Sequence, residues 1–292
     1  MNVAKLTQMV LTASVMLIVC SLGLKASLQE AAQSQRRLQF IRSVLAMFII
    51  MPVIAGILVY ALSLPPALDI AFVALAVSPV PPVLPRKALA AGGTRSYVLR
   101  LFVGAAITSI LFVPVEVDLT EMIFGWPARM SLGAIARVVT ISIIAPLGVG
   151  LALRRVSPGF AERWSEPLSR FSTLLLIISL LPVLFTQGSA AISLIGNGTL
   201  LAIAIFVTVG LIAGNLLGGP SASDRTVLAL STASRHPGIA MAIASTNFPN
   251  QKLVLPAILL YLIVSAILSW VFLTWVRPKE RESTTGGRQS AA

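Results

Sequence analysis

Charged residues, cysteine and histidine are all scarce in this sequence. Only 11% of its 292 residues are charged, and it has one cysteine and one histidine. Because soluble domains carry about 25% charged residues, the composition excludes a soluble globular protein. The lone Cys20 excludes a disulfide within the chain. The sequence has no cysteine–histidine metal cluster and no phosphate-binding glycine loop, so it predicts a protein that is not an enzyme.

Long hydrophobic runs take up most of the chain. Hydrophobic residues make up 57% of it, in runs of about 20 residues, the length of a helix that crosses a bilayer. The ten-residue alternation of a transmembrane β-barrel is absent from the sequence. We interpret the first run as a helix and not as a cleaved leader, because no small residue precedes Cys20 as a lipoprotein cleavage site would need. The sequence predicts an all-α, multi-pass membrane protein of about nine transmembrane helices, at residues 6–24, 40–62, 67–90, 97–115, 131–153, 168–186, 198–218, 226–248 and 253–276.

The basic residues are grouped in alternate connections between these runs. The net charge is +12, and most of the basic residues lie in the segments 25–42, 86–100, 154–170, 225 and 277–288. The remaining connections are neutral or acidic, and the one at 116–130 holds Glu116, Asp118 and Glu121. The positive-inside rule then places the N-terminus outside and the C-terminus in the cytoplasm, in a cell (inner or plasma) membrane. This topology explains the charge without a nucleic-acid partner, and it leaves no acidic residue deep in any span.

The eighth run is interrupted near its middle by polar residues. Arg235, His236, Pro237 and Gly238 follow one another inside an apolar stretch from about residue 226 to 248. A guanidinium at that depth costs at least about 2.5–3.5 kcal/mol, so its presence requires a partner or a function. Proline removes a backbone donor and clashes with the preceding turn, so we expect the helix to break here. A broken helix with a cation at mid-membrane is typical of a transporter binding site.

The third run carries four prolines between Pro79 and Pro85. One interpretation ends the helix near Ser78 and makes Arg86 and Lys87 anchors at the cytoplasmic surface. The other, which we favour, is an unwound stretch inside the membrane followed by a short half-helix over residues 83–91. A helix from residue 67 to 78 alone would be about 18 Å long, against a hydrocarbon core of about 30 Å.

Glycines recur at every fourth position of the seventh run, at Gly210, Gly214 and Gly218. This spacing places them on one face of a helix. Small residues on one face let another helix approach closely, so the pattern predicts a tight helix–helix contact.

With its third and eighth helices interrupted, the chain resembles the bile acid:sodium symporter family in its nine-helix form, over about residues 6–276. The segment Leu64-Pro65-Pro66-Ala67-Leu68 is similar to the approach to that family's first crossover, and Leu230-Ser231 with Pro237-Gly238-Ile239-Ala240 is similar to the second. The resemblance implies an inverted-repeat fold in which the two broken helices cross. They would belong to a core (residues 40–115 and 198–276) that moves against a panel (residues 6–24 and 131–186). Residues 277–292 are expected to form a disordered cytoplasmic tail.

Other residues occupy the sodium-binding positions of that family here. Aligned without gaps, its serine–asparagine pair falls on Leu84 and Pro85, and its glutamate and glutamine–asparagine pair fall on Ser231, Arg235 and His236. Sodium needs several hard oxygen ligands. The resemblance thus implies sodium as a possible coupling ion, whereas the residues themselves predict no cofactor and no metal site. Uniport, exchange and proton coupling are the alternatives.

Arg235 is the predicted centre of the site. Its five donors suit a carboxylate or a sulfonate, and the alternative is a structural arginine bound by carbonyls freed at Pro237 and by nearby hydroxyls. His236 is either a proton carrier or a neutral hydrogen-bonded group, and Arg86 either contributes to the site or extends to the cytoplasmic surface. The predicted substrate-binding residues are Arg235, His236, Ser231, Ser234, Pro237, Gly238, Ser78, Pro79, Pro82 and Arg86.

The sequence therefore predicts a secondary transporter that moves a small organic anion across the lipid bilayer by alternating access. One alternative is an exporter of an inorganic anion or metalloid on a related fold. Another is a membrane sensor that binds its ligand without transporting it.

Overall fold

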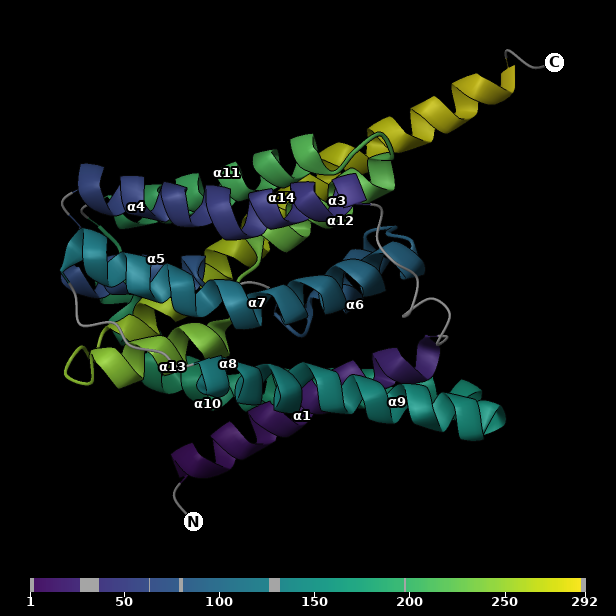
Figure 1. Ribbon diagram of the computed structural model, residues 1–292, viewed down its shortest axis with the longest axis horizontal. Coiled ribbons are helices and arrows are strands. Elements are labelled where there is room, and N and C mark those ends of the chain that lie inside the picture. The colour runs from purple at the N-terminus through teal and green to yellow at the C-terminus, as the bar shows by residue number, and fades with distance from the viewer. Residues whose placement is uncertain are drawn as a thin grey trace.

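The computed structural model describes residues 3–26, 37–62, 64–78, 81–125, 132–196 and 198–289. Within these ranges the regular elements are all helices, which lie alongside one another in an elongated bundle (Figure 1). Six helical segments are long and apolar enough to cross a membrane: Arg37–Ala61, Arg95–Phe124, Ile135–Val156, Pro158–Ser193, Thr199–Leu217 and Val254–Val276. The prediction of an all-α membrane protein is confirmed at this level.

Two of the long helices contain a π-helical stretch just before a proline. The first consists of α3 (Arg37–Val44), η1 (Leu45–Ile50) and α4 (Met51–Ala61), and the second of α8 (Leu132–Val139), η2 (Thr140–Ile144) and α9 (Ala145–Val156). Pro52 and Pro146 stand at the second position of α4 and α9. Since proline lacks an N–H and its ring clashes with the previous turn, the helix widens there. The widening leaves backbone carbonyls without a helical donor.

Both predicted interruptions are present. The third run forms α5 (Pro66–Ala76) and, after a gap, α6 (Leu84–Ala90). The eighth run forms α12 (Ala222–Ala233) and α13 (Pro237–Asn247). Each second half-helix begins at or beside a proline, which is tolerated in the first turn of a helix but not in its middle.

Helix α7 (Arg95–Phe124) is longer than the sequence predicts. It passes through Pro114 without a break and ends at Gly125, whose φ of 65° closes the last turn. The prediction that the connection begins at residue 116 is wrong, because residues 116–124 are helical. Glu116 is consequently a helix residue and is buried, with 7% of its surface exposed. The expectation that no acidic residue lies inside the bundle is therefore corrected as well.

The remaining helices complete the bundle. They are α1 (Val3–Lys25), α10 (Pro158–Ser193), α11 (Thr199–Leu217) and α14 (Val254–Gln289). Side chains beyond Val276 lie outside the described residues, so the disorder of residues 277–292 stays a prediction.

Glycines bring several of these helices into backbone contact. A Cβ added at Gly214 of α11 would lie 2.5 Å from the Cα of Ala229, and one at Gly210 would lie 3.0 Å from the Cα of Ala233, both in α12. The close packing predicted from the glycine spacing is confirmed. In the same way α1 crosses α9 where Gly23 and Gly150 meet, each facing the other's backbone.

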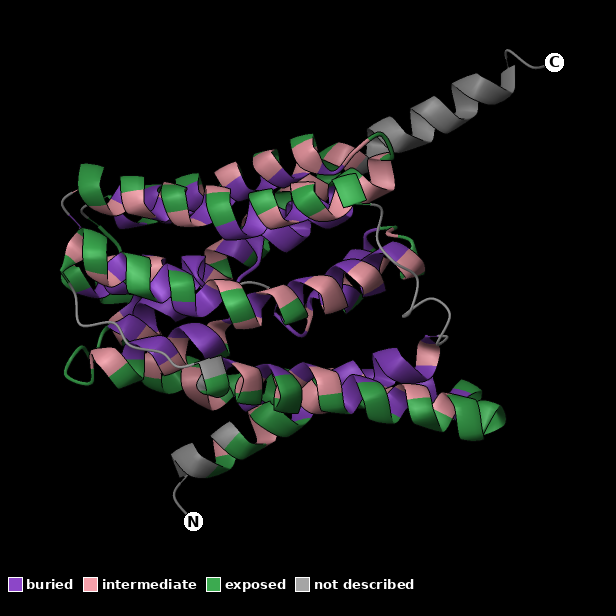
Figure 2. Cartoon of the chain, in the orientation of Figure 1, coloured by how far each residue is buried: buried purple, intermediate pink, exposed green. Residues whose placement is uncertain are grey.

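The helices pack in two groups. Helix α1 packs against α9 and α10, and these helices lie together along one edge in Figure 1. In the rest of the bundle, α5 packs against α13, α6 against α12, and α12 against α11. Buried residues lie on the faces that the helices turn toward one another, as Figure 2 shows.

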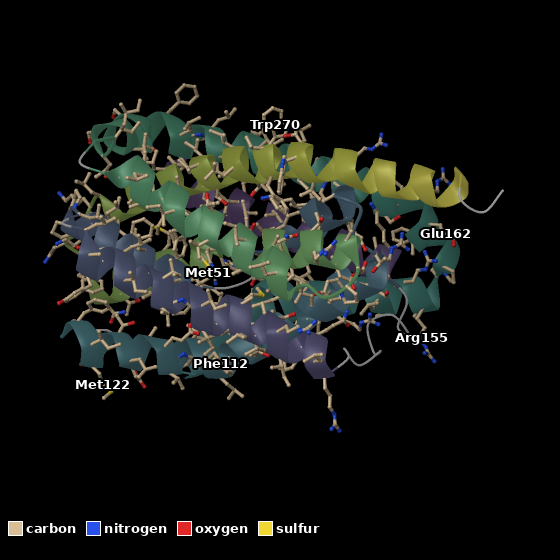
Figure 3. All side chains as sticks on the ribbon, turned by 90° about the horizontal axis from the view of Figure 1, so that it is seen from above. Met51, Phe112, Met122, Arg155, Glu162 and Trp270 are labelled. Carbon is tan, nitrogen blue, oxygen red and sulfur yellow. The ribbon has the colours of Figure 1, made fainter. Side chains whose placement is uncertain are left out.

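The outer faces of the bundle are apolar. Met122, Phe185 and Trp270 are among the large hydrophobic side chains that are more than half exposed, and Figure 3 shows Met122 and Trp270 pointing outward. The charged residues Arg155 and Glu162 lie together at one end. An apolar girth with charges at an end is the surface that a bilayer requires.

Candidate functional site

The two interrupted helices meet at their breaks. The backbone N–H of His236, between α12 and α13, donates a hydrogen bond of 2.7 Å to the carbonyl of Ser78, just after α5. Because α5 packs on α13 and α6 on α12, the two breaks lie against each other and four half-helix ends converge there. We call this junction, residues 76–78 and 233–237, the crossover.

Arg235 extends from the crossover into the interior of the protein. It is 1% exposed and is the largest of the fully buried side chains. Its Nη1 donates to the carbonyl of Met47 at 3.0 Å and to the carbonyl of Ala76 at 3.2 Å. The guanidinium thereby meets two other helices, α5 and the one that contains η1.

The sequence explains why both carbonyls are available. Ala76 is the last residue of α5, and the last carbonyls of a helix have no intrahelical donor. Met47 lies in η1, five residues before Pro52, and Pro52 has no N–H to complete the π-helical bond. The partial negative charge at the C-terminus of α5 also favours a cation at this position.

The other edge of the guanidinium has no partner. Among the described residues, Nε and Nη2 of Arg235 are buried without a hydrogen bond. These two nitrogens form one of the edges by which arginine holds a carboxylate in a bidentate pair. Arg235 is therefore anchored to the protein at Nη1 and presents a complete carboxylate-binding edge on the opposite side.

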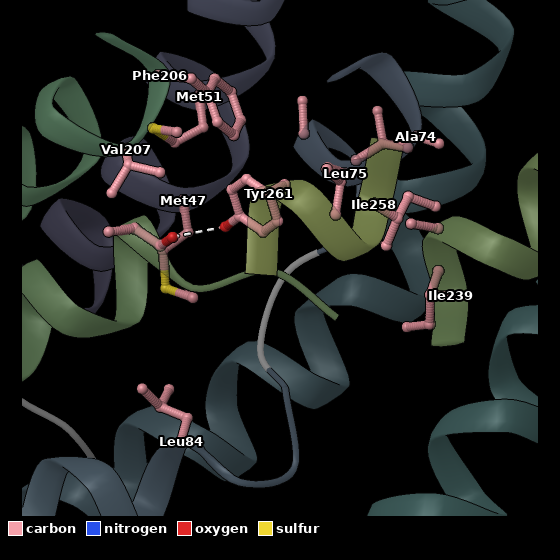
Figure 4. Packing of buried hydrophobic residues seen from close by; sticks show 14 of the residues in the cluster. Met47, Met51, Ala74, Leu75, Leu84, Phe206, Val207, Ile239, Ile258 and Tyr261 are labelled. Atoms are coloured by element: carbon pink, nitrogen blue, oxygen red, sulfur yellow. Dashed lines mark hydrogen bonds between the residues drawn. The ribbon is translucent and has the colours of Figure 1, made fainter. Parts of the chain in front are cut away.

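The carbonyl of Ala233, at the end of α12, is held by α14. The hydroxyl of Tyr261 donates to it at 2.6 Å, and the hydroxyl of Ser265 donates at 3.4 Å. Figure 4 shows Tyr261 with its hydrogen bond, among the apolar side chains packed around Met47 and Met51. This contact fixes the end of α12 two residues before Arg235.

His236 serves as the N-cap of α13. Its Nδ1 accepts from the N–H of Ile239 at 3.2 Å, so Nδ1 carries a lone pair and the proton resides on Nε2. Nε2 is buried and, in the described part of the chain, has no partner. The neutral, hydrogen-bonded interpretation of His236 matches this geometry.

Glu116 is a charged residue of the interior that sequence reasoning missed. It lies on α7, 7% exposed, and both its carboxylate oxygens are buried without a partner among the described residues. It forms no ion pair with Arg235 among the described residues. The sequence signal for its burial is the spacing of Ser109, Val113, Glu116 and Thr120, which places all four on one face of a helix. In the structure this is a buried face of α7.

The other predicted residues differ in how closely they join the crossover. The hydroxyls of Ser78 and Ser231 donate to carbonyls of their own helices, Ala74 and Val227. Ser234 and Pro82 are buried, Pro237 is half-buried and Gly238 is exposed. Pro79 lies outside the described residues.

Arg86 is directed away from the crossover. It lies in α6, and its Nη1 donates to the carbonyl of Ser169 in α10 at 3.5 Å. It therefore joins a half-helix of one grouping to the long helix of the other.

A narrow pocket lies beside the crossover, between α5, α7 and α13. Its lining is apolar except for Thr120, and it includes Val77, next to the Ala76 carbonyl that holds Arg235. Val117 and Thr120 of α7 also line it, one and four residues after Glu116. Arg235 itself is not among the residues that line this pocket.

The described residues contain no group of three or more histidine, cysteine, aspartate or glutamate side chains that could hold a metal ion. At the crossover the backbone carbonyls of Met47 and Ala76 accept hydrogen bonds from the guanidinium of Arg235. Because these two carbonyls already accept from a nitrogen cation, they are not free to coordinate sodium.

Comparison with known proteins adds one match. A sequence model described as the Sodium Bile acid symporter family matches residues 12–195, more than half of the chain. No curated protein matches the chain. The matched region contains the first interrupted helix and Glu116, whereas Arg235 and the second interruption lie beyond it.

Proposed function

The chain belongs to the sodium bile acid symporter family, and from this premise we propose that it is a secondary transporter that moves a small organic anion by alternating access. The family and the membrane-capable helices make it a multi-pass membrane transporter. The anion and its binding residues are the part that we propose.

The observation that carries the proposal is the unpaired edge of Arg235. A fixed guanidinium with Nε and Nη2 free and buried offers two parallel donors to a carboxylate or sulfonate. Burial strengthens such a contact, because bulk water does not compete for the hydrogen bonds of either group and the surrounding dielectric constant is low. Since Arg235 is 1% exposed, an anion reaches it only after neighbouring helices have moved, which is the basis of alternating access.

We further infer that the positive charge of Arg235 replaces the charge that a bound metal ion supplies in an ion-coupled transporter. Its Nη1 bridges the end of α5 and the π-turn of η1, where a metal ion would otherwise draw carbonyls together. The positive charge is thus permanently attached to the protein. Transport is then independent of sodium.

The arrangement in the membrane belongs to the same proposal. We infer nine spans, the third and eighth of them broken, with the inverted-repeat core moving against a panel made of α1, α8, α9 and α10. The mutual packing of α1, α9 and α10 supports this division. Arg86 and Ser169 would then link core and panel on the side where basic residues gather, which we assign to the cytoplasm. The N-terminus would lie outside the cell.

The test is binding by purified protein with Arg235 replaced. Thermal-shift screening against acetate, pyruvate, octanoate and methanesulfonate identifies an anion that stabilises the wild type. We expect Arg235→Ala to remove that stabilisation. Arg235→Lys keeps the charge but loses the paired donors, and we expect about 10–100-fold weaker binding, the value of roughly 1.5–3 kcal/mol for a charged hydrogen bond.

The matched control is Arg137→Ala, which removes an exposed arginine of α8 and should bind as the wild type does. Unchanged anion binding by folded Arg235→Ala protein would show that this residue is not the site. Binding without flux in proteoliposomes would favour the sensor over the transporter. Stabilisation by inorganic oxyanions alone would favour the inorganic-anion exporter.

A further inference from the structure

We propose that Glu116 binds the proton that travels with the anion, so that protonation of Glu116 and anion binding at Arg235 are coupled. This inference rests on the proposed function, because it names the coupling ion of the same site. It makes the protein a proton–anion symporter.

The position of Glu116 is the first support. A carboxylate with 7% of its residue exposed and both oxygens unpaired is unstable as an isolated ion in a bilayer interior. Two species can relieve it: a proton on the carboxylate, or a nearby positive charge. The described ion pairs include none between Glu116 and Arg235. One pocket is lined by Val77, next to the carbonyl that holds Arg235, and by Val117, next to Glu116, so Arg235 can attract the carboxylate without occupying its oxygens.

The balance of charge is the second support. With Glu116 ionised, it and Arg235 together carry no net charge, and an incoming anion would leave one negative charge in the interior. With Glu116 protonated, Arg235 is left with one positive charge that the anion neutralises. Anion binding is therefore stronger to the protonated form, and by thermodynamic linkage the bound anion raises the affinity of Glu116 for its proton by the same factor.

Other titratable groups are less suited to this role. Titratable side chains lie on α7 itself and on the helices packed against it or lining its pocket. On α7 they are Arg95, Tyr97, Arg100, Asp118 and Glu121. On the neighbouring elements they are, besides Arg235 and His236, Arg37 and Arg42 of α3, Asp69 of α5, Arg86 and Lys87 of α6, and Arg137 of α8. Among these, Asp69 also has a buried carboxylate oxygen without a partner, but it stands in the first turn of α5 and is only half-buried, whereas both oxygens of Glu116 are buried. His236 uses Nδ1 to cap α13, so taking up a proton there would break the cap.

The first experiment needs no transport substrate. An infrared pH titration of purified wild type should show a carboxylic-acid carbonyl band that disappears at alkaline pH and that Glu116→Gln lacks. The control is Asp118→Asn, an exposed carboxylate two residues away on the same helix, which should keep the band. A band of unchanged intensity in Glu116→Gln would overturn the inference whatever the protein transports, and Asp69→Asn identifies any part of the band that comes from the half-buried Asp69.

The second experiment measures anion affinity against pH with the carboxylate or sulfonate that the thermal-shift screen identifies. The wild-type Kd should rise by up to about tenfold per pH unit above the pKa of Glu116, the slope of one linked proton. Glu116→Gln mimics the protonated acid, so its Kd should stay low and independent of pH. Glu116→Asp keeps a carboxylate and should keep a pH-dependent Kd if the glutamine variant is poorly folded.

The third experiment follows the proton itself. In proteoliposomes that contain a pH-sensitive dye, an inward gradient of that anion should acidify the lumen with wild type and not with Glu116→Gln. Glu116→Gln should still exchange labelled for unlabelled anion. Failure of both proteins to bind any anion would contradict the proposed function, whereas anion transport with equal proton movement in both would contradict only the role of Glu116.

Discussion

Arg235 is stable in the bilayer interior because two features far away in the chain each leave a backbone carbonyl without a donor. Ala76 ends a helix, and Met47 lies 188 residues before Arg235, in a turn that Pro52 prevents from closing. Charge-assisted hydrogen bonds to such carbonyls offset the cost of removing the guanidinium from water. The burial of Arg235 therefore depends on Pro52, although the two residues are remote in sequence.

Tyr261 allows a prediction at the same scale. Tyr261→Phe removes a 2.6 Å hydrogen bond to the carbonyl of Ala233 at the end of α12. We expect a loss of about 1–2 kcal/mol, because Ser265, at 3.4 Å, remains only a weak partner for that buried carbonyl. Thermal unfolding in detergent should show a lower midpoint.

The control for this prediction is Tyr60→Phe, since Tyr60 is 91% exposed and its hydroxyl contributes nothing to the interior. Its midpoint should equal that of the wild type. A Tyr261→Phe midpoint equal to the wild type would show that Ser265 alone holds the end of α12.

The position of Arg235 inside the bundle could be predicted from the sequence, whereas that of Glu116 could not, and the reasons are physical. A guanidinium inside an apolar run is conspicuous because no neighbouring residue explains it. Glu116 stands two residues after a proline and beside Asp118 and Glu121, a pattern typical of a loop. The helix continues through Pro114 because neighbouring helices bury that stretch, and such packing is not visible in a local pattern.

At the scale of elements, the two interrupted helices break next to prolines, and α11 contacts α12 closely at glycines. Both effects are local, so both interruptions and the α11–α12 contact could be predicted from spacing. The π-turns could not, because a proline inside a span permits a kink, a bulge or an undisturbed helix. Pro52 and Pro146 follow π-turns, whereas Pro114 does not disturb α7.

Helix α9 offers a matched pair of glycines. A Cβ at Gly150 would collide with the carbonyl of Cys20 and lie 2.8 Å from the Cα of Gly23, whereas one at Gly148 would meet nothing within 4 Å. We expect Gly150→Ala to lose about 1–3 kcal/mol, since both clashes are with backbone. Gly148→Ala should be neutral or gain up to about 1 kcal/mol from helix propensity.

Unfolding midpoints of the two variants in detergent check this prediction. Equal midpoints would mean that α1 and α9 can separate without cost, which would contradict a rigid panel. A lower midpoint for Gly150→Ala alone would place their contact among those that hold α1 to the bundle.

At the scale of the whole molecule, the proposed function predicts which ions drive transport. Uptake of the anion into proteoliposomes should proceed at the same rate when sodium is replaced by choline at a fixed membrane potential. The reason is that Arg235 occupies the carbonyls that a cation would need. Strict dependence on sodium would show that oxygen ligands exist elsewhere in the chain.

A charge that is part of the polypeptide also restricts how the carrier can run without its cargo. With anion and proton both bound, or with neither, the interior of the protein is neutral, and a membrane potential favours no direction for its movement. With only one of them bound the interior holds an unbalanced charge that must be buried, and moving that charge across a full 100 mV involves about 2.3 kcal/mol of electrical work, which opposes the movement in one direction and favours it in the other. In the proposed symport, half-loaded forms are therefore the slow ones, and we expect the fixed guanidinium of Arg235 to limit slippage and leak.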